Sequence, residues 1–144
     1  MRQRARGITT VEFAFVSTVL FVTLFGVVEF GRLLYTYQVL AEGTRRAARL
    51  ATVCPLYDAG ITSTANFAAL PNFTPGNVLL QYLDGAGNPT AVYAQIAYVR
   101  VQIVGYSVSL SIPLINPTVA TPAFPVTLPR ESLGVTPLAT YTCS

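Results

Sequence analysis

The chain contains no histidine, no lysine and no tryptophan, and only 10% of its 144 residues are charged. Without histidine it lacks the usual general base and the commonest metal ligand. Without lysine it lacks the Schiff-base amine and the lysine of phosphate-binding P-loops. Its few carboxylates show no spacing typical of paired acid and base groups. The sequence therefore predicts a protein that is not an enzyme and that holds no metal or organic cofactor.

The basic charge is concentrated at the N-terminus. The formal net charge is +3 and the isoelectric point is about 9.1. Arg2, Arg4 and Arg6 supply the whole excess, because the remaining six arginines are balanced by six acidic residues. A basic surface that binds phosphates would spread over the folded domain. We therefore expect no nucleic-acid partner.

Residues 13–28 form an uninterrupted apolar run, with Glu12 before it and Glu29 after it. The run reaches the roughly 20 residues that a bilayer requires when residues 8–11 are added. Because the arginines precede it, we expect the N-terminus to remain in the cytoplasm and the rest to be exported. A cleavable secretory signal is an alternative, although no small-x-small cleavage site follows the run.

The helical pattern continues beyond this run. Leu33, Tyr37, Leu40 and Ala51 belong to a series of apolar residues at three- and four-residue steps, and no proline occurs before Pro55. We expect one continuous helix over residues 9–53, ending at Cys54-Pro55. Its membrane half is predicted at residues 8–31 and its amphipathic exported half at 32–53. On the exported half Glu42 should pair with Arg46, one turn on. The arginines there are a solvated face or a contact with another subunit.

Glu12 needs an explanation, because a carboxylate in hydrocarbon costs a few kcal/mol. Cleavage between Gly7 and Ile8 would create a protonated amine on Ile8, one helical turn from Glu12. If that amine belongs to a neighbouring subunit, the pair would set the register of helix packing. An alternative without cleavage is a capping box, in which Thr9 and Glu12 satisfy the first backbone N–H groups of the helix.

Residues 54–144 are predicted to form a small β-rich exported domain. Irregular structure is expected over 56–77, a strand over 78–83, and a turn at Asp84-Gly85 that leads into a second β-rich run. In that run the apolar positions change parity at Gly105, which indicates a bend between two strands. Six prolines between residues 113 and 137 predict an extended loop, and residues 138–144 a last edge strand.

Cys54 and Cys143 are the two cysteines of the chain. An even count in an exported protein favours a disulfide between them, and two buried free thiols are the alternative. Such a bond would tie the C-terminal tail to the end of the long helix.

The N-terminal motif resembles the type IV prepilin signal: arginines, then Gly7, an apolar residue, and Glu12 at the fifth position after the glycine. More narrowly, the VEF at residues 11–13, the FGVVEFGR at 25–32 and the TRRAARLA at 44–51 resemble TadE-like pseudopilins of tight adherence (Tad/Flp) pili. Arg46 and Ala47 depart from that family, in which Glu and Gly are common. The resemblance covers about residues 6–51.

This resemblance implies an α+β, type IV pilin-like fold, with a long N-terminal helix, a small antiparallel sheet and proline-rich loops. It implies that residues 1–7 are a leader, removed by a prepilin peptidase that cuts between Gly7 and Ile8, and that Glu12 acts in assembly.

The expected function is that of a minor pilin, which supports pilus biogenesis, adhesion and biofilm formation. Its expected partners are the peptidase, other pilin subunits through the N-terminal helix, the inner-membrane assembly platform and, before assembly, membrane lipid. The exported domain would lie in the periplasm and later at the cell surface. The alternative is an uncleaved, signal-anchored periplasmic binding or assembly-factor domain, which would retain residues 1–7.

Overall fold

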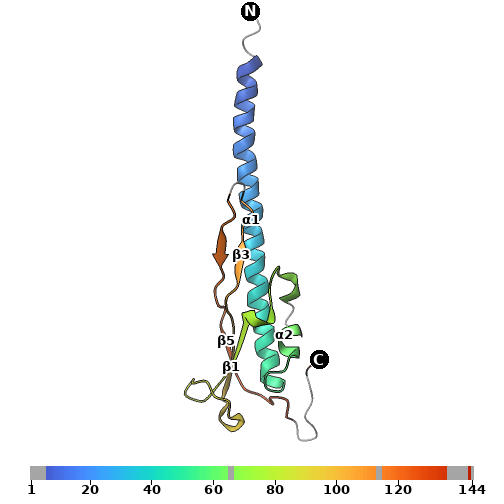
Figure 1. The fold of residues 1–144 in the computed structure, drawn as a ribbon, viewed down its shortest axis with the longest axis vertical. Helices are drawn as coiled ribbons and strands as arrows, with labels where there is room; N and C mark the ends of the chain where they lie inside the picture. Colours follow the sequence, from blue (N-terminus) through green and yellow to red (C-terminus); the bar gives the residue numbers. More distant parts are fainter. Residues whose placement is uncertain (1–5, 65–66, 113–114, 136–142, 144) are drawn as a thin grey trace, which may run out of the picture.

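The computed structural model describes residues 6–64, 67–112, 115–135 and 143. Its central element is one long helix, α1 (Arg6–Val53), whose N-terminal half extends away from everything else (Figure 1). A small antiparallel sheet packs on the other half. The predicted fold class, α+β with a long N-terminal helix, is confirmed.

Helix α1 has 48 residues, about 72 Å at 1.5 Å per residue. It is unbroken because no residue within it is a proline and most of its side chains favour or tolerate helical geometry. It stops where the sequence predicts, because Pro55 disfavours helical geometry at Cys54.

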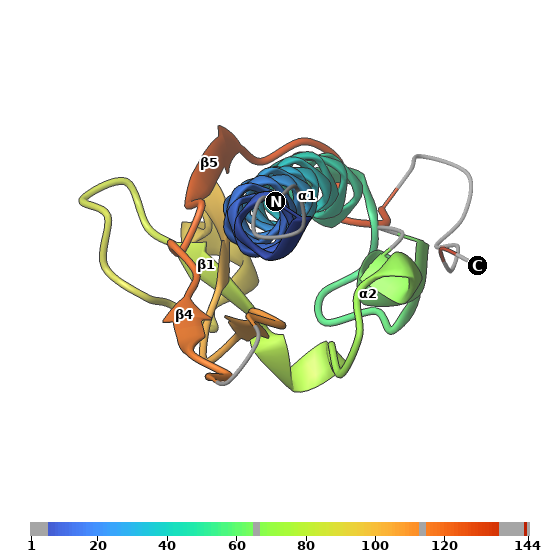
Figure 2. The ribbon, with the colours of Figure 1, turned by 90° about the horizontal axis from the view of Figure 1, so that it is seen from above.

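The remaining elements are short. They are α2 (Gly60–Thr64), η1 (Phe67–Ala69), η2 (Pro75–Asn77), β1 (Val78–Leu83), η3 (Tyr93–Gln95), β2 (Tyr98–Ile103), β3 (Ser107–Ser109), β4 (Thr118–Ala120) and β5 (Val126–Pro129). Seen along the helix axis, the strands lie on one side of α1 and α2 lies on the other (Figure 2).

The strands form two antiparallel sheets. The larger has the order β1-β2-β5, so β2 is central, with Val99 opposite Tyr82 on one side and Leu128 on the other. The smaller pairs β3 with β4 and places Val108 opposite Val119. Strand β2 contacts α1 directly and carries the inner face of the sheet.

The core lies between β2 and one face of α1. Leu40, Ala47 and Ala51 on the helix and Val99 and Val101 on the strand are fully buried. The alanines lack long side chains, so the strand can approach the helix closely. Each buried leucine or valine contributes about 1.5–3 kcal/mol.

Gly105 separates two strands as the sequence predicts. The buried residues of β2 are odd-numbered (Val99, Val101 and Ile103), whereas Tyr106 and Val108 beyond the glycine are even-numbered. The backbone of Gly105 has a φ of 63°, a left-handed conformation that glycine adopts without a steric penalty. The bend moves the chain from β2 to β3, which belongs to the smaller sheet.

The connection between β1 and β2 contains the predicted turn. The Asp84 carboxylate accepts hydrogen bonds from the N–H groups of Ala86 (2.9 Å) and Asn88 (2.8 Å). These backbone donors, Asn88 foremost, hold the pKa of Asp84 below its usual value. The connection is longer than a tight hairpin because η3 follows the turn.

The prediction of an extended loop over residues 113–137 is wrong in part. Two strands, β4 and β5, lie in this segment. Proline is compatible with them because β5 is an edge strand that ends at Pro129, and β4 pairs on one side with β3. The strand predicted for residues 138–144 lies outside the described residues, apart from Cys143.

The chain after β5 caps the C-terminal end of α1. The N–H groups of Glu131 and Leu133 both donate to the carbonyl of Thr52 at 3.1 Å, and Gly134 N–H donates to Val53 at 2.6 Å. The last carbonyls of a helix have no partner within the helix. These contacts satisfy two of them and fix the end of the helix to the domain.

Cys54 and Cys143 form a disulfide with a sequence separation of 89 residues. This is the pairing that the sequence favours. The bond starts one residue beyond α1 and holds Cys143 at the same helix end that residues 131–134 cap.

We expect reduction of this disulfide to lower the free energy of unfolding by up to about 4–5 kcal/mol, because the bond closes a long loop in the unfolded chain. Urea titration of the detergent-solubilised protein, followed by far-ultraviolet circular dichroism with and without reductant, measures the change. Unchanged midpoints would contradict the expectation.

A second prediction concerns Gly43, over which the ring of Phe67 packs. A Cβ built on Gly43 would lie 2.3 Å from Phe67 Cε1, whereas one on Gly31 meets nothing within 4 Å. Gly43→Ala should therefore destabilise the domain by about 1–3 kcal/mol despite the better helix propensity of alanine. Gly31→Ala is the matched control and should be neutral or slightly stabilising. Equal unfolding midpoints for both variants would contradict this packing.

Candidate functional site: the free helix and its boundary with the domain

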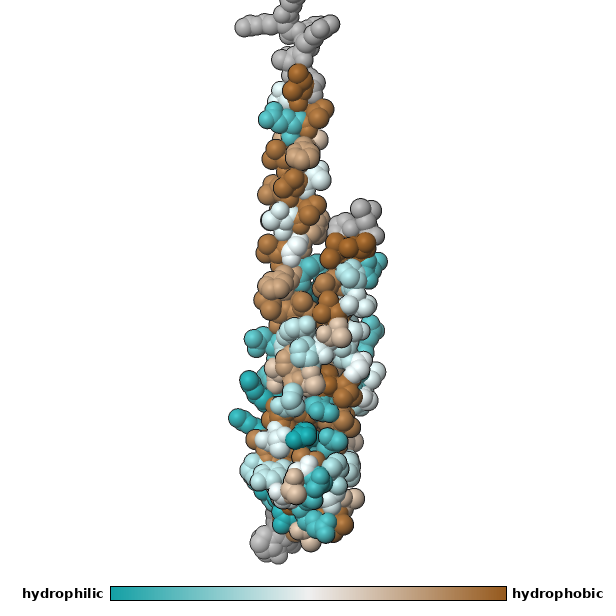
Figure 3. Space-filling view, turned by 90° about the vertical axis from the view of Figure 1, so that its left-hand side faces the viewer, coloured by the Kyte–Doolittle hydropathy of each residue, from teal (hydrophilic) through white to brown (hydrophobic). Residues whose placement is uncertain are grey.

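The N-terminal half of α1, residues 8–31, is apolar and uncovered, and is called the free half below. Its large apolar side chains are between 51% (Leu24) and 73% (Phe13) exposed. Figure 3 shows mostly hydrophobic side chains along the free half, in contrast to the mixed surface of the domain. The segment has a mean hydropathy of 2.2 and is long enough to cross a membrane. The arrangement suits a membrane anchor.

Hydroxyl groups in this half bond within the helix. Ser17 and Thr18 both donate to the Ala14 carbonyl, at 3.0 and 2.8 Å, and Thr23 donates to Val19 at 2.9 Å. In hydrocarbon a polar group must be satisfied internally, because no water is present. These side chains therefore fit a lipid environment without a partner.

Glu12 lies near the start of α1 and is exposed. Among the described residues no cation forms an ion pair with it. Helical geometry places it one turn from Ile8 on the same side of α1. The structure thus presents the acid on an uncovered apolar rod, where an outside partner can reach it.

The capping-box alternative for Glu12 does not fit this helix. An N-cap residue stands at the boundary of a helix and has non-helical backbone geometry. Here α1 already includes Arg6 and Gly7, so Thr9 lies inside the helix. In this structure Thr9 is therefore not the N-cap residue of α1.

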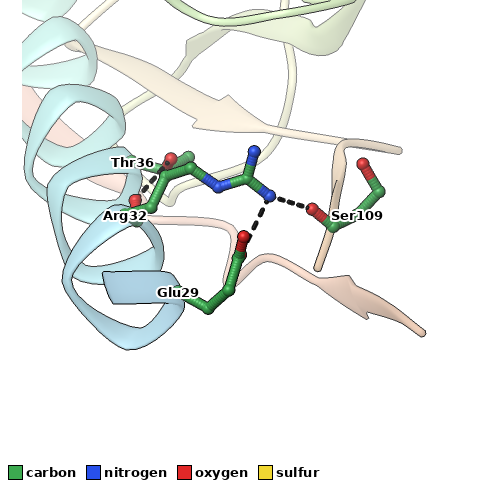
Figure 4. A network of polar contacts seen from close by, with 4 residues as sticks. All are labelled: Glu29, Arg32, Thr36 and Ser109. Carbon is green, nitrogen blue, oxygen red and sulfur yellow. Dashed lines mark hydrogen bonds and ion pairs between the residues drawn. The ribbon is translucent and has the colours of Figure 1, made fainter. Parts of the chain in front are cut away.

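A small polar network marks the place where the free half of α1 meets the domain (Figure 4). The Arg32 guanidinium forms an ion pair with Glu29, with 3.1 Å between Nη2 and Oε2. The same nitrogen donates a hydrogen bond to the Ser109 carbonyl on β3. Thr36 donates to the carbonyl of Arg32 at 3.0 Å. Arg32 thus joins α1 to the smaller sheet.

Glu29 is partly enclosed by this contact. Its side chain is 15% exposed and that of Arg32 is 45% exposed. The Glu29 Oε2 atom is buried, and its contact with Arg32 lacks hydrogen-bond geometry, so it is an ion pair only. The sequence identifies Glu29 as the end of the apolar run but not the bond from Arg32 to β3. The three-residue spacing of Glu29 and Arg32 would have indicated the ion pair, and no sequence signal identifies Ser109.

The predicted pair on the C-terminal half of α1 is present. Arg46 Nε lies 3.0 Å from Glu42 Oε1. This hydrogen bond holds the pKa of the Glu42 carboxyl below its usual value, and the charges of Arg46, Arg45 and Arg49 act in the same direction. All four side chains are exposed, so this face is open both to solvent and to another subunit.

The domain has grooves on its surface. One has a volume of about 460 Å³ and contacts α2, η1 and η2. It is lined by Ala59, Thr62, Ser63, Phe67, Phe73, Thr74, Pro75 and Val78. Within the described residues, no group of three or more His, Cys, Asp or Glu side chains could hold a metal ion.

Comparison with known proteins gives one result. No curated protein and no solved structure shows significant similarity to the chain. The family model described as TadE-like protein matches residues 7–49, less than a third of the chain. The match begins at Gly7 and includes Glu12, Glu29 and Arg32. The resemblance noted from the sequence is thus confirmed over residues 7–49, which are similar to the TadE-like family.

Proposed function

We propose that this chain is a minor pilin, or pseudopilin, of a tight adherence (Tad) pilus. The TadE-like match supports a pilin-like role related to such pili. The observation that carries the proposal is the free half of α1, an apolar rod exposed on all sides with one acid near its start. A rod of this kind is stable only in lipid or among similar helices.

In this proposal residues 1–7 are a leader that a prepilin peptidase removes. Glycine before the cut leaves the backbone accessible to an enzyme, because it has no side chain. Cleavage gives Ile8 a positive α-amino group. The products would be a membrane half at 8–31, an exported amphipathic half at 32–53 and a β-rich exported domain at 54–144.

Glu12 is proposed to set the register of assembly. In the membrane-stored subunit it can pair with the amine of Ile8, and in a pilus with that of a neighbour. A charge pair in a low-dielectric surrounding is favoured over two separate charges. The side chains of the free half would then exchange lipid for other pilin helices, with the inner-membrane assembly platform driving extraction.

The exported domain would supply the surface properties of the subunit, which include adhesion and support of biofilm formation. The Cys54–Cys143 disulfide suits an exported location, because disulfides persist in oxidising compartments. The proposed role is structural, so the peptidase acts on this chain and the chain itself does not catalyse.

Processing is tested by intact mass spectrometry of the protein from its pilus-producing cells, with and without the prepilin peptidase. We expect the mass to lack residues 1–7 only when the peptidase is present. Gly7→Val should block cleavage, because a branched side chain would obstruct access to the peptide bond. Gly26→Val is the matched control, since a Cβ there meets nothing within 4 Å, and it should be cleaved normally.

Retention of residues 1–7 in protein from cells that contain the peptidase would contradict processing. That result would favour the alternative function, an uncleaved, signal-anchored binding or assembly-factor domain in the periplasm.

The role of Glu12 is tested by Glu12→Gln, which removes the charge and keeps the shape. We expect incorporation into pili to fall by roughly tenfold or more, equivalent to about 1.4 kcal/mol of lost pairing. Processing and membrane insertion should persist. Quantitative immunoblotting of sheared pili and membranes measures both.

Glu42→Gln provides the matched control for this variant. Glu42 is also an exposed acid on α1, but it lies on the exported half and pairs with Arg46. This variant should be incorporated normally. Equal incorporation of Glu12→Gln and the unmodified protein would exclude the proposed role of Glu12.

A further inference from the structure

The hairpin made by β3 and β4 is the part of the domain nearest to the free half of α1. Its two strands run beside the helix, and its described part extends farther toward the N-terminus than the other described loops (Figure 1). The Arg32 hydrogen bond to the Ser109 carbonyl fixes β3 to α1 at this level.

The length of the hairpin indicates how far its tip extends. Ile112 follows Ser109 by three residues, about 10 Å of extended chain at 3.3 Å per residue. That distance equals about two turns of α1 toward the N-terminus from Arg32. The tip therefore lies beside the last turns of the apolar segment, near Phe25 to Glu29. At this height along α1, the proposed function places the helix side chains in a bilayer.

The described residues at the tip are apolar and uncovered. Ile112 is 38% exposed and Ile115 is 60% exposed. The two form an isolated β-bridge, in which Ile115 N–H donates to the Ile112 carbonyl at 3.1 Å. Such internal pairing reduces the number of backbone groups that need water.

Charge is absent over a long stretch around the tip. No Asp, Glu, Lys or Arg occurs in the sequence between Arg100 and Arg130. The nearest charges on the helix, Glu29 and Arg32, pair with each other. Tyr35, one turn beyond Arg32 on the domain side, is 59% exposed. Exposed tyrosines are enriched where a protein meets the membrane surface.

We propose that the β3–β4 hairpin is a second membrane contact, with Ile112 and Ile115 inserted into the outer leaflet while the subunit is stored in the membrane. This rests on the membrane-anchored state in the proposed function. Lipid is the occupant because the tip is apolar and lies at the same height along α1 as apolar side chains that lipid would surround. Arg32 and Tyr35 then lie at the headgroup level, where long cationic and tyrosine side chains are favoured.

Two contacts would hold the domain in one orientation above the membrane. A single helix leaves a domain free to rotate and tilt. A hairpin tip inserted beside the helix restricts both motions. It also adds apolar surface that must leave the lipid when the subunit enters a pilus.

The absence of tryptophan from the chain allows a direct test. Ile115→Trp introduces a single tryptophan at the tip, and the full-length protein is reconstituted into vesicles of phosphatidylethanolamine and phosphatidylglycerol. We expect the fluorescence emission of this tryptophan to lie at shorter wavelength than that of a tryptophan exposed to water. We also expect quenching by brominated lipids and protection from an aqueous quencher. Ile112→Trp is a second probe of the same contact.

Val92→Trp is the matched control. Val92 is 54% exposed, close to the 60% of Ile115, and lies in the connection between β1 and β2, at the opposite end of the domain (Figure 1). Its tryptophan should be reached by the aqueous quencher and not by brominated lipids.

Four outcomes would overturn the inference. Equal quenching of both tryptophans by brominated lipids would refute a lipid contact specific to the tip. Protection of Ile115→Trp without lipid quenching would show that another copy of the chain covers it. Failure of the unmodified protein to float with the vesicles would contradict membrane anchoring itself, and with it the proposed function. Flotation with an aqueous tip would refute the inference alone.

Discussion

The helix α1 presents more apolar surface than the rest of this chain can cover, and the other features of the structure follow from that. A domain of this size can bury one face of a helix along part of its length. The C-terminal half is covered in this way, by β2 and its neighbours. The N-terminal half has no cover within the described residues, although water disfavours so much exposed apolar surface. Its length and composition suit a membrane anchor.

The two acids of the apolar half mark its ends. Glu12 and Glu29 are about 25 Å apart along the helix at 1.5 Å per residue, close to the thickness of a hydrocarbon core. Their surroundings differ. Glu29 is paired with Arg32 at the edge of the domain, so its charge is compensated within the chain. Glu12 has no ion pair among the described residues, and the proposed cleavage would create a cation for it. The charge at one end is thus compensated within the chain, and the charge at the other end is exposed.

The covered half shows how a small sheet can hold a long helix. Alanines on the buried face let the strand approach, and the segment after β5 satisfies the last helical carbonyls. Gly134 permits this approach, since it has a φ of 77° and a Cβ there would lie 2.5 Å from Pro55 Cγ. The disulfide fastens the same end. The C-terminal end of α1 is thus held to the domain by several independent contacts.

The sequence predicted the features that depend on local pattern. Helix α1, its end at Cys54-Pro55, the strands β1 and β2, the bend at Gly105 and the Glu42–Arg46 pair all follow from periodicity, proline or spacing. What it missed depends on contacts between distant residues. Strands β4 and β5 form because partners elsewhere in the chain offer free edges, which overrides the proline content. The Arg32 contact with Ser109 joins residues 77 positions apart, and no pattern within either segment specifies it.

The central claim is that the free half of α1 needs an apolar environment outside the chain. Alkaline carbonate extraction of membranes from cells that make the protein but lack the assembly machinery tests it directly. The account predicts that the full-length chain remains in the membrane pellet, as an integral protein does. Release of the folded, disulfide-bonded protein into the soluble fraction as a monomer would contradict it, because the exposed rod would then be stable in water.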